Sequence, residues 1–241
     1  MTPASADHLA IVKQQREDLH AQYRRIEKAH ALAVLDHLAA YLRDACPEAV
    51  YVTFAYYGNT RTLDLNGVLG AQPSPLGACP WLWDGSDEAH PLAEIGEDIE
   101  LDLASALAPY DSPAWACVSR NSASDGNSWL LELPPPDRAA RIAELVRGYH
   151  PEATALVVDG PSAGGRVLEV VEGVTEDGSE AQTRRRWSRE CDHAITRLVA
   201  QIFALPELAD RHLVPTYGLY ASGDGRGSSD LVRLLPLPPT A

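Results

Sequence analysis

Apolar and polar positions follow the same order twice along the chain. In each run, a stretch with helical spacing ends at the tripeptide Pro-Glu-Ala, and a β-branched or aromatic stretch begins there. Pro47 and Pro151 mark these two junctions and are 104 positions apart. Proline ends a helix and favours extended backbone in the residue before it. Each junction is therefore expected to close a helix and open a strand.

Other landmarks keep the same spacing. Trp83 and Trp187 are 104 positions apart, and so are Leu130 and Leu234, which open two similar Leu- and Pro-rich segments. We interpret the chain as an internal duplication behind a long N-terminal helix. Because the two repeats differ most in the segments 72–98 and 175–197, we expect function to lie there.

Within each repeat, the strands are predicted in adjacent pairs. Alternating or β-branched stretches flank turn residues at 50–57 and 61–65, and again at 155–158 and 166–170. A second pair is predicted near the end of each repeat, at 115–119 with 128–133 and at 219–221 with 231–235. Neighbouring strands joined by turns pair antiparallel.

The predicted fold class is α+β. Internally duplicated helix–hairpin–helix–hairpin units form antiparallel sheet or sheets with helices on one face. The predicted domains are an N-terminal helical extension (1–30), a first α+β repeat (31–136) and a second repeat (137–241). Pro134, Pro135 and Pro136 predict a stiff linker, and Asp137 is expected to cap the following helix, 138–149.

The N-terminal helix is predicted from the absence of Gly and Pro between residues 4 and 46. At 1.5 Å per residue it would be ~60 Å long. Its apolar residues recur at steps of three and four, with Arg16 and His30 interrupting the stripe; they are Leu9, Val12, Leu19, Tyr23, Ile26 and Ala33. Packing of this stripe against the chain's own sheet is favoured, and a coiled-coil contact with another subunit is the alternative.

A second amphipathic helix is predicted from about 187 to 203. Its apolar face includes Trp187 and Ile195, and its polar face carries Arg186, His193 and Arg197. The comparable segment of the first repeat is interrupted by proline and glycine, so only a shorter helix at 101–107 is predicted there.

Composition narrows the function classes. The hydrophobic fraction is 45 % and the formal net charge is −14. Such a charge disfavours binding to nucleic acid or to an anionic membrane. No apolar run or N-terminal pattern predicts a membrane span or a secretory signal. None of the four cysteines lies in a CxxC pair, so we expect reduced thiols in a cytoplasmic protein.

The strongest candidate site is a basic patch on the predicted second helix. Arginine side chains suit carboxylates and phosphates, so the patch could bind an anion or an acidic partner. A solvated helix face, or pairing of the patch with the acidic segment of the first repeat, is favoured over such a site. The candidate anion- or partner-binding residues are Arg184, Arg185, Arg186, Arg189, His193, Arg197, Arg61, Arg166, Trp83 and Trp187.

The sequence shows no recognisable catalytic set. Cys191 and His193 would point to opposite faces of a helix, and no G-x-S-x-G motif is present. The glycine-rich segment 159–165 lacks the Lys-Ser/Thr pair of a phosphate loop, and the acidic segment 94–102 fits no EF-hand. No metal and no cofactor are therefore expected.

Two functional hypotheses follow. In the first, the protein is an acidic cytoplasmic binding or regulatory protein that engages a protein partner, or a second copy of itself, through the N-terminal helix and the divergent segments. In the second, it is an enzyme or a small-anion-binding protein with a site between the two repeats, near Arg61, Arg166, Trp83 and Trp187. The absence of a catalytic set favours the first.

Overall fold

The computed structural model describes residues 3–58, 62–74, 79–108, 111–124, 127–160, 165–173, 183–187, 192–215 and 232–239. The chain is mixed α+β, and its described residues form five α-helices and two antiparallel five-stranded sheets. It divides into two compact units, Met1–Leu133 (unit 1) and Pro134–Ala241 (unit 2). No described helix combines the length and apolarity needed to cross a bilayer.

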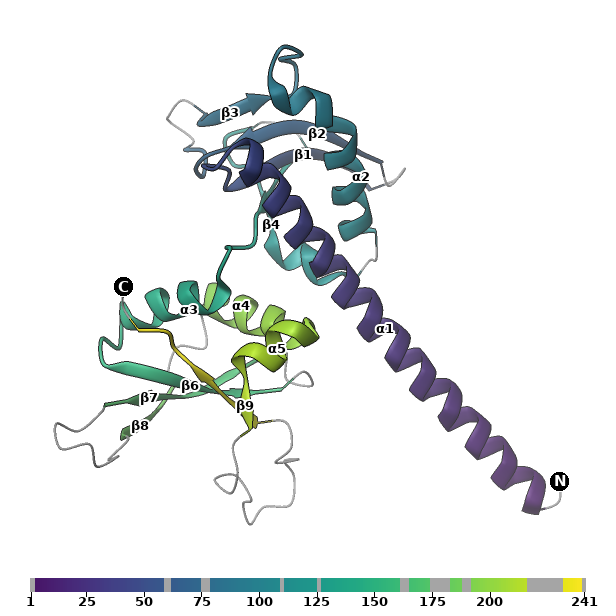
Figure 1. Cartoon of the computed structure of the whole chain (residues 1–241). Coiled ribbons are helices and arrows are strands. Elements are labelled where there is room, and N and C mark those ends of the chain that lie inside the picture. Colours follow the sequence, from purple (N-terminus) through teal and green to yellow (C-terminus); the bar gives the residue numbers. More distant parts are fainter. Residues whose placement is uncertain are drawn as a thin grey trace. The chain divides into compact units, whose positions relative to one another are not determined.

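Unit 1 begins with the long helix α1 (Pro3–Ala45), which extends well past the sheet of its unit (Figure 1). Its sheet has the strand order β3-β2-β1-β5-β4. The strands are β1 (Tyr51–Tyr57), β2 (Thr62–Leu69), β3 (Trp81–Asp84), β4 (Val118–Arg120) and β5 (Ser128–Glu132). Between β3 and β4 lie η1 (Pro91–Ile95), α2 (Gly96–Leu107) and η2 (Pro113–Cys117).

The core of unit 1 joins the C-terminal third of α1 to α2 and the sheet. Leu35, Leu38 and Leu42 of α1 recur at helical spacing and are buried, as are Ile99 and Leu103 of α2. The two helices pack against each other. The sheet contributes apolar side chains from alternate strand positions; these are Val52, Phe54, Val68 and Leu131.

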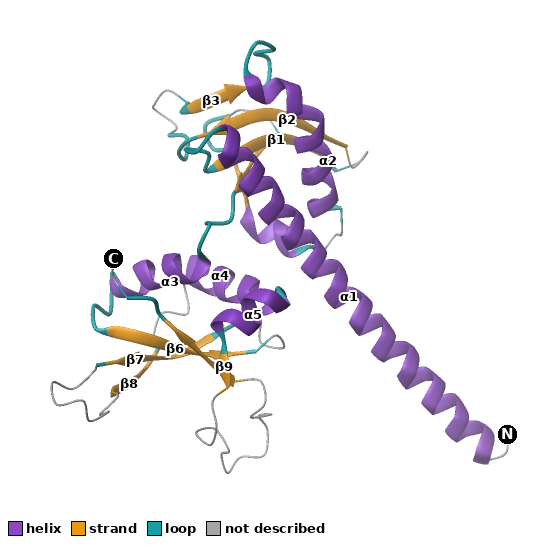
Figure 2. Cartoon of the chain, in the orientation of Figure 1, coloured by secondary structure: helices purple, strands orange, loops and turns teal. Residues whose placement is uncertain are grey.

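Unit 2 has the sheet order β8-β7-β6-β10-β9, with α3, α4 and α5 on one face (Figure 2). The strands are β6 (Ala153–Asp159), β7 (Val167–Glu172), β8 (Thr183–Arg186), β9 (Val214–Pro215) and β10 (Val232–Pro236). The helices are α3 (Arg138–Arg147), α4 (His193–Ala204) and α5 (Pro206–His212).

The junctions have the expected structure. After α1, the backbone N–H of Ala49 donates to the carbonyl of Cys46 at 2.9 Å, and after α3 the N–H of Ala153 donates to His150 at 3.0 Å. Both bonds close a tight turn between helix and strand. The cap of α3 is also confirmed, because the Asp137 carboxylate accepts from the backbone N–H of Ala140 at 2.9 Å.

The strand register repeats between the units. Five consecutive pairs between β1 and β5 recur between β6 and β10, each residue 104 positions later along the chain. Val52 faces Leu131 in unit 1, and Leu156 faces Leu235 in unit 2. The offset first seen in the Pro-Glu-Ala junctions is thus also the offset of the backbone pairing.

Each sheet has a β-bulge at the same place, after Thr53 in unit 1 and after Val157 in unit 2. The extra residues are Asn66 on β2 and Leu168 on β7. A bulge bends a strand and increases its twist. Because the bulges recur, the two sheets share an irregularity as well as an order.

The sequence offset between equivalent residues of the two units is different on the outer strands. The N–H of Gly85 donates to the carbonyl of Asn66 at 2.8 Å, and the N–H of Trp187 donates to Leu168 at 2.9 Å. These equivalent bonds are 102 positions apart. The predicted match of Trp83 with Trp187 is therefore wrong by two residues, because the two tryptophans occupy different register positions.

Several predicted elements need correction. The helix predicted from 187 begins only at His193, since Thr183–Arg186 is the strand β8. Both third strands, β3 and β8, were absent from the prediction, as were α5 and β9. The helix predicted at 101–107 begins at Gly96, because an N-terminal glycine does not interrupt the helix interior. The strand predicted at 219–221 lies outside the described residues.

Candidate functional site

The predicted basic patch does not lie on one helix. Arg185 and Arg186 belong to the edge strand β8, whereas His193 opens α4 and Arg197 lies one turn into it. The side chain of Arg184 and the whole of Arg189 lie outside the described residues. Strand and helix periodicities separate these side chains, so the single basic helix face is not formed.

Arg185 is bound within its own sheet. Its Nε donates to Oε2 of Glu172 at 2.6 Å, and Nδ1 of His150 lies 2.6 Å from Oε1 of the same carboxylate. The His150 ring contacts the indole of Trp187, with the ring centroids 5.8 Å apart. His150 therefore links Trp187 to the pair of Glu172 and Arg185. This arrangement supports a structural role for Arg185, because its guanidinium already contacts a carboxylate.

The two candidate strand arginines are not equivalent. The N–H of Asp159 donates to the carbonyl of Arg166 at 2.8 Å, and the corresponding pair in unit 1 is Ala55 with Asp64. Arg166 thus occupies the register position of Asp64. Arg61 lies outside the described residues. Arg166 therefore corresponds to an acidic residue in unit 1, because the β2 and β7 positions are related by 102 residues.

Trp83 is a core residue of unit 1. It is buried, its ring stacks with that of His90 at a centroid distance of 6.4 Å, and its Nε1 donates to the carbonyl of Asp87 at 3.1 Å. An indole that is packed and hydrogen-bonded in this way stabilises the loop after β3. The indole nitrogen is consequently engaged within the chain.

The Cys-Asp-His triplet has a structural role at the residues that are described. The carboxylate of Asp192 accepts from the backbone N–H of Ile195 at 3.3 Å and so caps α4. Cys191 lies outside the described residues. Among the residues whose placement is given, no group of three or more His, Cys, Asp or Glu side chains could hold a metal ion.

Two features of unit 1 remain available for binding, and the first is the stripe on α1. Packing of this stripe within the chain was expected, and that expectation is wrong. Leu9, Leu19 and Ile26 are 60 %, 65 % and 67 % exposed, and Val12 and Tyr23 are also exposed. The helix first contacts the body of unit 1 near Arg24 and Lys28, whose cationic groups pair with Asp111.

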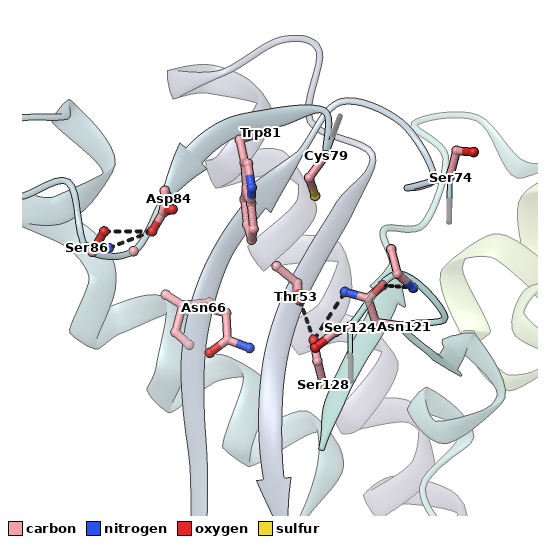
Figure 3. Close-up of a pocket in the computed structure, with 13 residues that line it drawn as sticks. Thr53, Asn66, Ser74, Cys79, Trp81, Asp84, Ser86, Asn121, Ser124 and Ser128 are labelled. Atoms are coloured by element: carbon pink, nitrogen blue, oxygen red, sulfur yellow. Dashed lines mark hydrogen bonds between the residues drawn. The ribbon is translucent and has the colours of Figure 1, made fainter. Parts of the chain in front are cut away.

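The second feature is a pocket of about 480 Å³ on the sheet face opposite α1 and α2 (Figure 3). Its hydroxyl and amide side chains come from β1, β2, β5 and the loops around them; they are Thr53, Asn66, Ser74, Asn121, Ser124 and Ser128. Trp81 and Asp84 of β3, the hydroxyl of Ser86 and the thiol of Cys79 complete the polar and aromatic lining.

The floor of this pocket is a buried hydrogen-bond network. The hydroxyls of Thr53 and Ser128 lie 3.2 Å apart, and the amide nitrogen of Asn121 donates to the Ser128 hydroxyl at 3.2 Å. The Asn121 carbonyl oxygen accepts from the N–H of Ala123 at 3.1 Å. Thr53 and Ser128 are only 1 % and 8 % exposed, so their hydroxyls are largely shielded from solvent. The hydrogen bonds between these side chains satisfy the buried polar groups.

Two ionisable side chains that line the pocket, Asp84 and Cys79, have shifted pKa values. Hydrogen bonds from the backbone and then from the hydroxyl of Ser86 lower the pKa of Asp84 from its ordinary value of 3.8. Burial, and then the charge of Asp84, raise the pKa of the Cys79 thiol above 9.0. At neutral pH the pocket therefore contains a carboxylate and a protonated thiol, which is a poor nucleophile.

The pocket was missed at the sequence level because it depends on pairing between distant strands. Its signal was nonetheless present: Trp81 and Asp84 lie in the divergent segment 72–98, and Gly67 follows the predicted hairpin of 50–57 and 61–65. Without β3 in the prediction, nothing placed these residues on one face.

Comparisons with known proteins supply no family and no relative. No family model matches the chain, and neither a curated protein nor a solved structure shows significant similarity to it.

Proposed function

We propose that the protein is an acidic binding protein that engages a protein partner through the exposed stripe of α1. The observation that carries this proposal is the exposure of regularly spaced large apolar side chains on a helix that extends beyond its own core. Exposed apolar surface of this kind marks interaction sites. The absence of a recognisable catalytic set supports a binding role over an enzymatic one.

The stripe has the spacing of a short coiled-coil seam. Taking Leu9 as position a, the a and d positions repeat every seven residues through Val12, Leu19 and Tyr23 to Ile26. These 18 residues cover about 27 Å of helix at 1.5 Å per residue. A seam of this shape accepts one partner helix along its length.

The partner helix that fits best is α1 of a second copy, aligned antiparallel. In that alignment Leu9 meets Ile26 of the other copy, Val12 meets Tyr23, and Arg16 meets Leu19. Lys13 then flanks Glu27 of the other copy, giving two pairs of opposite charge. Within one helix Lys13 makes only an exposed 3.8 Å contact with Glu17, which leaves its ammonium able to pair elsewhere.

A parallel alignment is less favourable. It would stack Arg16 on Arg16 of the other copy inside the seam, where two like charges repel. Its flanking pairs would be Gln22 with Glu27 and His8 with Lys13, so it would gain no ion pair of opposite charge. The charge pattern therefore favours the antiparallel arrangement.

We also propose that the two units arose by internal duplication of one unit. The recurring strand order, the common offset of 104 residues in the inner strands and the recurring bulge support this origin. Duplication would preserve the scaffold and leave the segments 72–98 and 175–197 free to diverge. The pocket of unit 1 draws six of its lining residues from the first of these segments.

The proposal is tested by the mass in solution, measured by sedimentation over a range of concentrations. The wild-type chain should reach twice 26.1 kDa, and Leu19→Glu should shift the equilibrium to the monomer. Ile11→Glu is the matched control, because Ile11 is 57 % exposed on the same helix and lies off the seam. A monomeric wild-type chain would reject a second copy as the partner, and equal effects of both variants would reject the seam.

The alignment is tested by charge reversal. Lys13→Glu and Glu27→Lys should each weaken the dimer, and the double variant should restore it, because each copy again pairs opposite charges. In a parallel dimer residues 13 and 27 lie about 21 Å apart along the helix, so the double variant would give no recovery.

A further inference from the structure

The pocket of unit 1 is built to recognise a positive charge. We propose that it binds an organic cation, an alkylammonium or guanidinium group, held between the indole of Trp81 and the carboxylate of Asp84. This site is distinct from the α1 stripe and does not depend on it. Four features of the described residues lead to this assignment.

The first feature is the charge of the lining. Asp84 is the one charged side chain among the residues that line the pocket. Around it, the stretch from residue 62 to residue 119 contains ten Asp and Glu residues and no Lys or Arg. An anionic ligand would meet the carboxylate of Asp84 and no cationic side chain among the lining residues, whereas a cation is attracted.

The second feature is the placement of the aromatic ring. Trp81 is 40 % exposed, so its indole is reachable from the pocket. The ring lies against Gly67: a Cβ built at Gly67 would be 2.9 Å from Cζ3 of Trp81. Gly67 also has a φ of 147°, which L-residues with side chains rarely adopt. The missing side chain thus leaves room for the ring above β2.

The third feature is the position of the carboxylate. Asp84 is the cross-strand partner of Gly67, and the ring of Trp81 lies against the same glycine. Figure 3 shows both side chains among those that line the pocket. The two bonds from Ser86 both end on Oδ1 of Asp84, at 3.0 and 2.9 Å. Oδ2 keeps its acceptor capacity for a ligand donor. Tryptophan is the best aromatic partner for a cation, and a carboxylate supplies the complementary charge.

The fourth feature is that the lining does not support covalent chemistry. The thiol of Cys79 stays protonated at neutral pH, because burial and Asp84 raise its pKa. The floor hydroxyls of Thr53 and Ser128 and the amide of Asn121 bond to one another. Asn66 adds a further amide to the lining, and this amide offers hydrogen bonds to the polar substituents of a bound molecule, which fits recognition.

Unit 2 differs from this arrangement at the equivalent positions that the structure describes. The register places Glu169 where unit 1 has Gly67, and Arg186 where it has Asp84. The position of the Thr53 hydroxyl is taken by Val157. The cation site is consequently expected in unit 1 alone, with one ligand per chain.

The test follows the indole N–H resonance of Trp81 in a nitrogen-labelled full-length sample during titrations. Choline is compared with its neutral isostere, in which carbon replaces the nitrogen. Choline should bind at least about tenfold more tightly, the ratio that ~1.4 kcal/mol of cation–aromatic and charge attraction produces. Asp84→Asn and Trp81→Leu should each remove this preference, whereas Asp87→Asn, which neutralises a neighbouring carboxylate outside the lining, should keep it.

Titrations with a second set of ligands distinguish the possible sources of the cation. These ligands are the N-acetylated amides of arginine and lysine, and the glutamine amide is the neutral control. Tighter binding of the arginine or lysine amide than of choline identifies a side chain of a peptide or protein, and the reverse order identifies a free organic ammonium. Equal binding of choline and its isostere would overturn the proposal. So would an Asp84→Asn variant that keeps the wild-type preference while its circular dichroism spectrum is unchanged.

Discussion

The two units share a scaffold and differ on the sheet face away from the helices. In unit 1 that face contains the hydroxyls of Thr53 and Ser128, and a pocket lies over them. In unit 2 the same register positions hold Val157 and Val232, which form a small buried apolar cluster with Ala155 and Val171. Backbone pairing has been kept while the chemistry of this face has changed completely.

The helix-covered face shows the opposite behaviour. Val52 and Leu131 of unit 1 correspond to Leu156 and Leu235 of unit 2, and all four are fully buried. A packed core tolerates changes of shape among apolar residues and rejects polar ones. The comparison teaches that the helix-covered face maintains the fold, and that the other face is where each unit acquires its own properties.

The two units also differ in net charge. Unit 1 contains 19 Asp and Glu residues and 8 Lys and Arg residues, a net charge of −11, whereas unit 2 contains 15 and 12, a net charge of −3. Most of the net negative charge therefore belongs to unit 1. The residues of the predicted basic patch, by contrast, belong to unit 2, where Arg185 pairs with Glu172.

The largest expected effect tests whether the two cores are equivalent. Leu131→Ala and Leu235→Ala remove the same side chain from matched, fully buried positions. Each should destabilise its own unit by about 2–5 kcal/mol, through lost burial and the cavity left behind. Hydrogen exchange read separately for residues 51–57 and 153–159 measures the two effects. A loss of protection in one unit only, for both variants, would break the equivalence.

A smaller effect tests the difference in polarity. Val157→Thr places a hydroxyl in the apolar cluster of unit 2 and should cost about 1–3 kcal/mol, because that hydroxyl is buried without a designed partner. Thr53→Val replaces the hydroxyl of unit 1 by a methyl group of similar size and should cost about 0.5–1.5 kcal/mol, the worth of one hydrogen bond. Chemical denaturation gives both values, and a larger loss for Thr53→Val would contradict this interpretation.

The cluster formed by His150, Glu172 and Arg185 in unit 2 has no counterpart among the described residues of unit 1. Glu172→Gln should destabilise unit 2 by about 1–2 kcal/mol, since the carboxylate bonds both His150 and Arg185 and is only slightly exposed. Arg185→Gln should cost less, because this guanidinium is 62 % exposed. Equal costs for the two variants would show that Glu172 acts through Arg185 alone.

The smallest expected effect is on the titration of Asp84. Ser86→Ala removes the hydroxyl bond and keeps the backbone bond, so the pKa of Asp84 should rise part of the way toward 3.8. A depressed pKa contributes stability above the unfolded-state value, and that contribution disappears as the pH falls through the folded-state pKa. The variant should therefore lose this small contribution at a slightly higher pH. Carboxyl resonances followed between pH 2 and 6 measure the shift, and an unchanged pKa would show that the hydroxyl bond is unimportant.

Local chemistry along the chain determined the mixed α+β class, both helix-to-strand junctions, the cap at Asp137 and the offset of 104 residues between inner strands. These features depend on neighbouring residues or on a repeated pattern, and both are visible in one dimension. The long helix α1 was likewise readable from the absence of helix breakers. Its exposed stripe was not, because exposure depends on which other segments reach the helix.

Only the tertiary structure decided which residues share a site. The short strands β3 and β8 carry too few residues for a periodic signal, and their side chains acquire neighbours only through pairing with β2 and β7. That pairing placed Trp81 and Asp84 beside Gly67, separated the predicted basic patch, and displaced the match of the two tryptophans by two residues. The pairing register of a strand is set by backbone hydrogen bonds to a strand that is distant in the sequence. A bulge shifts this register by one residue and leaves no clear mark in the hydrophobic pattern.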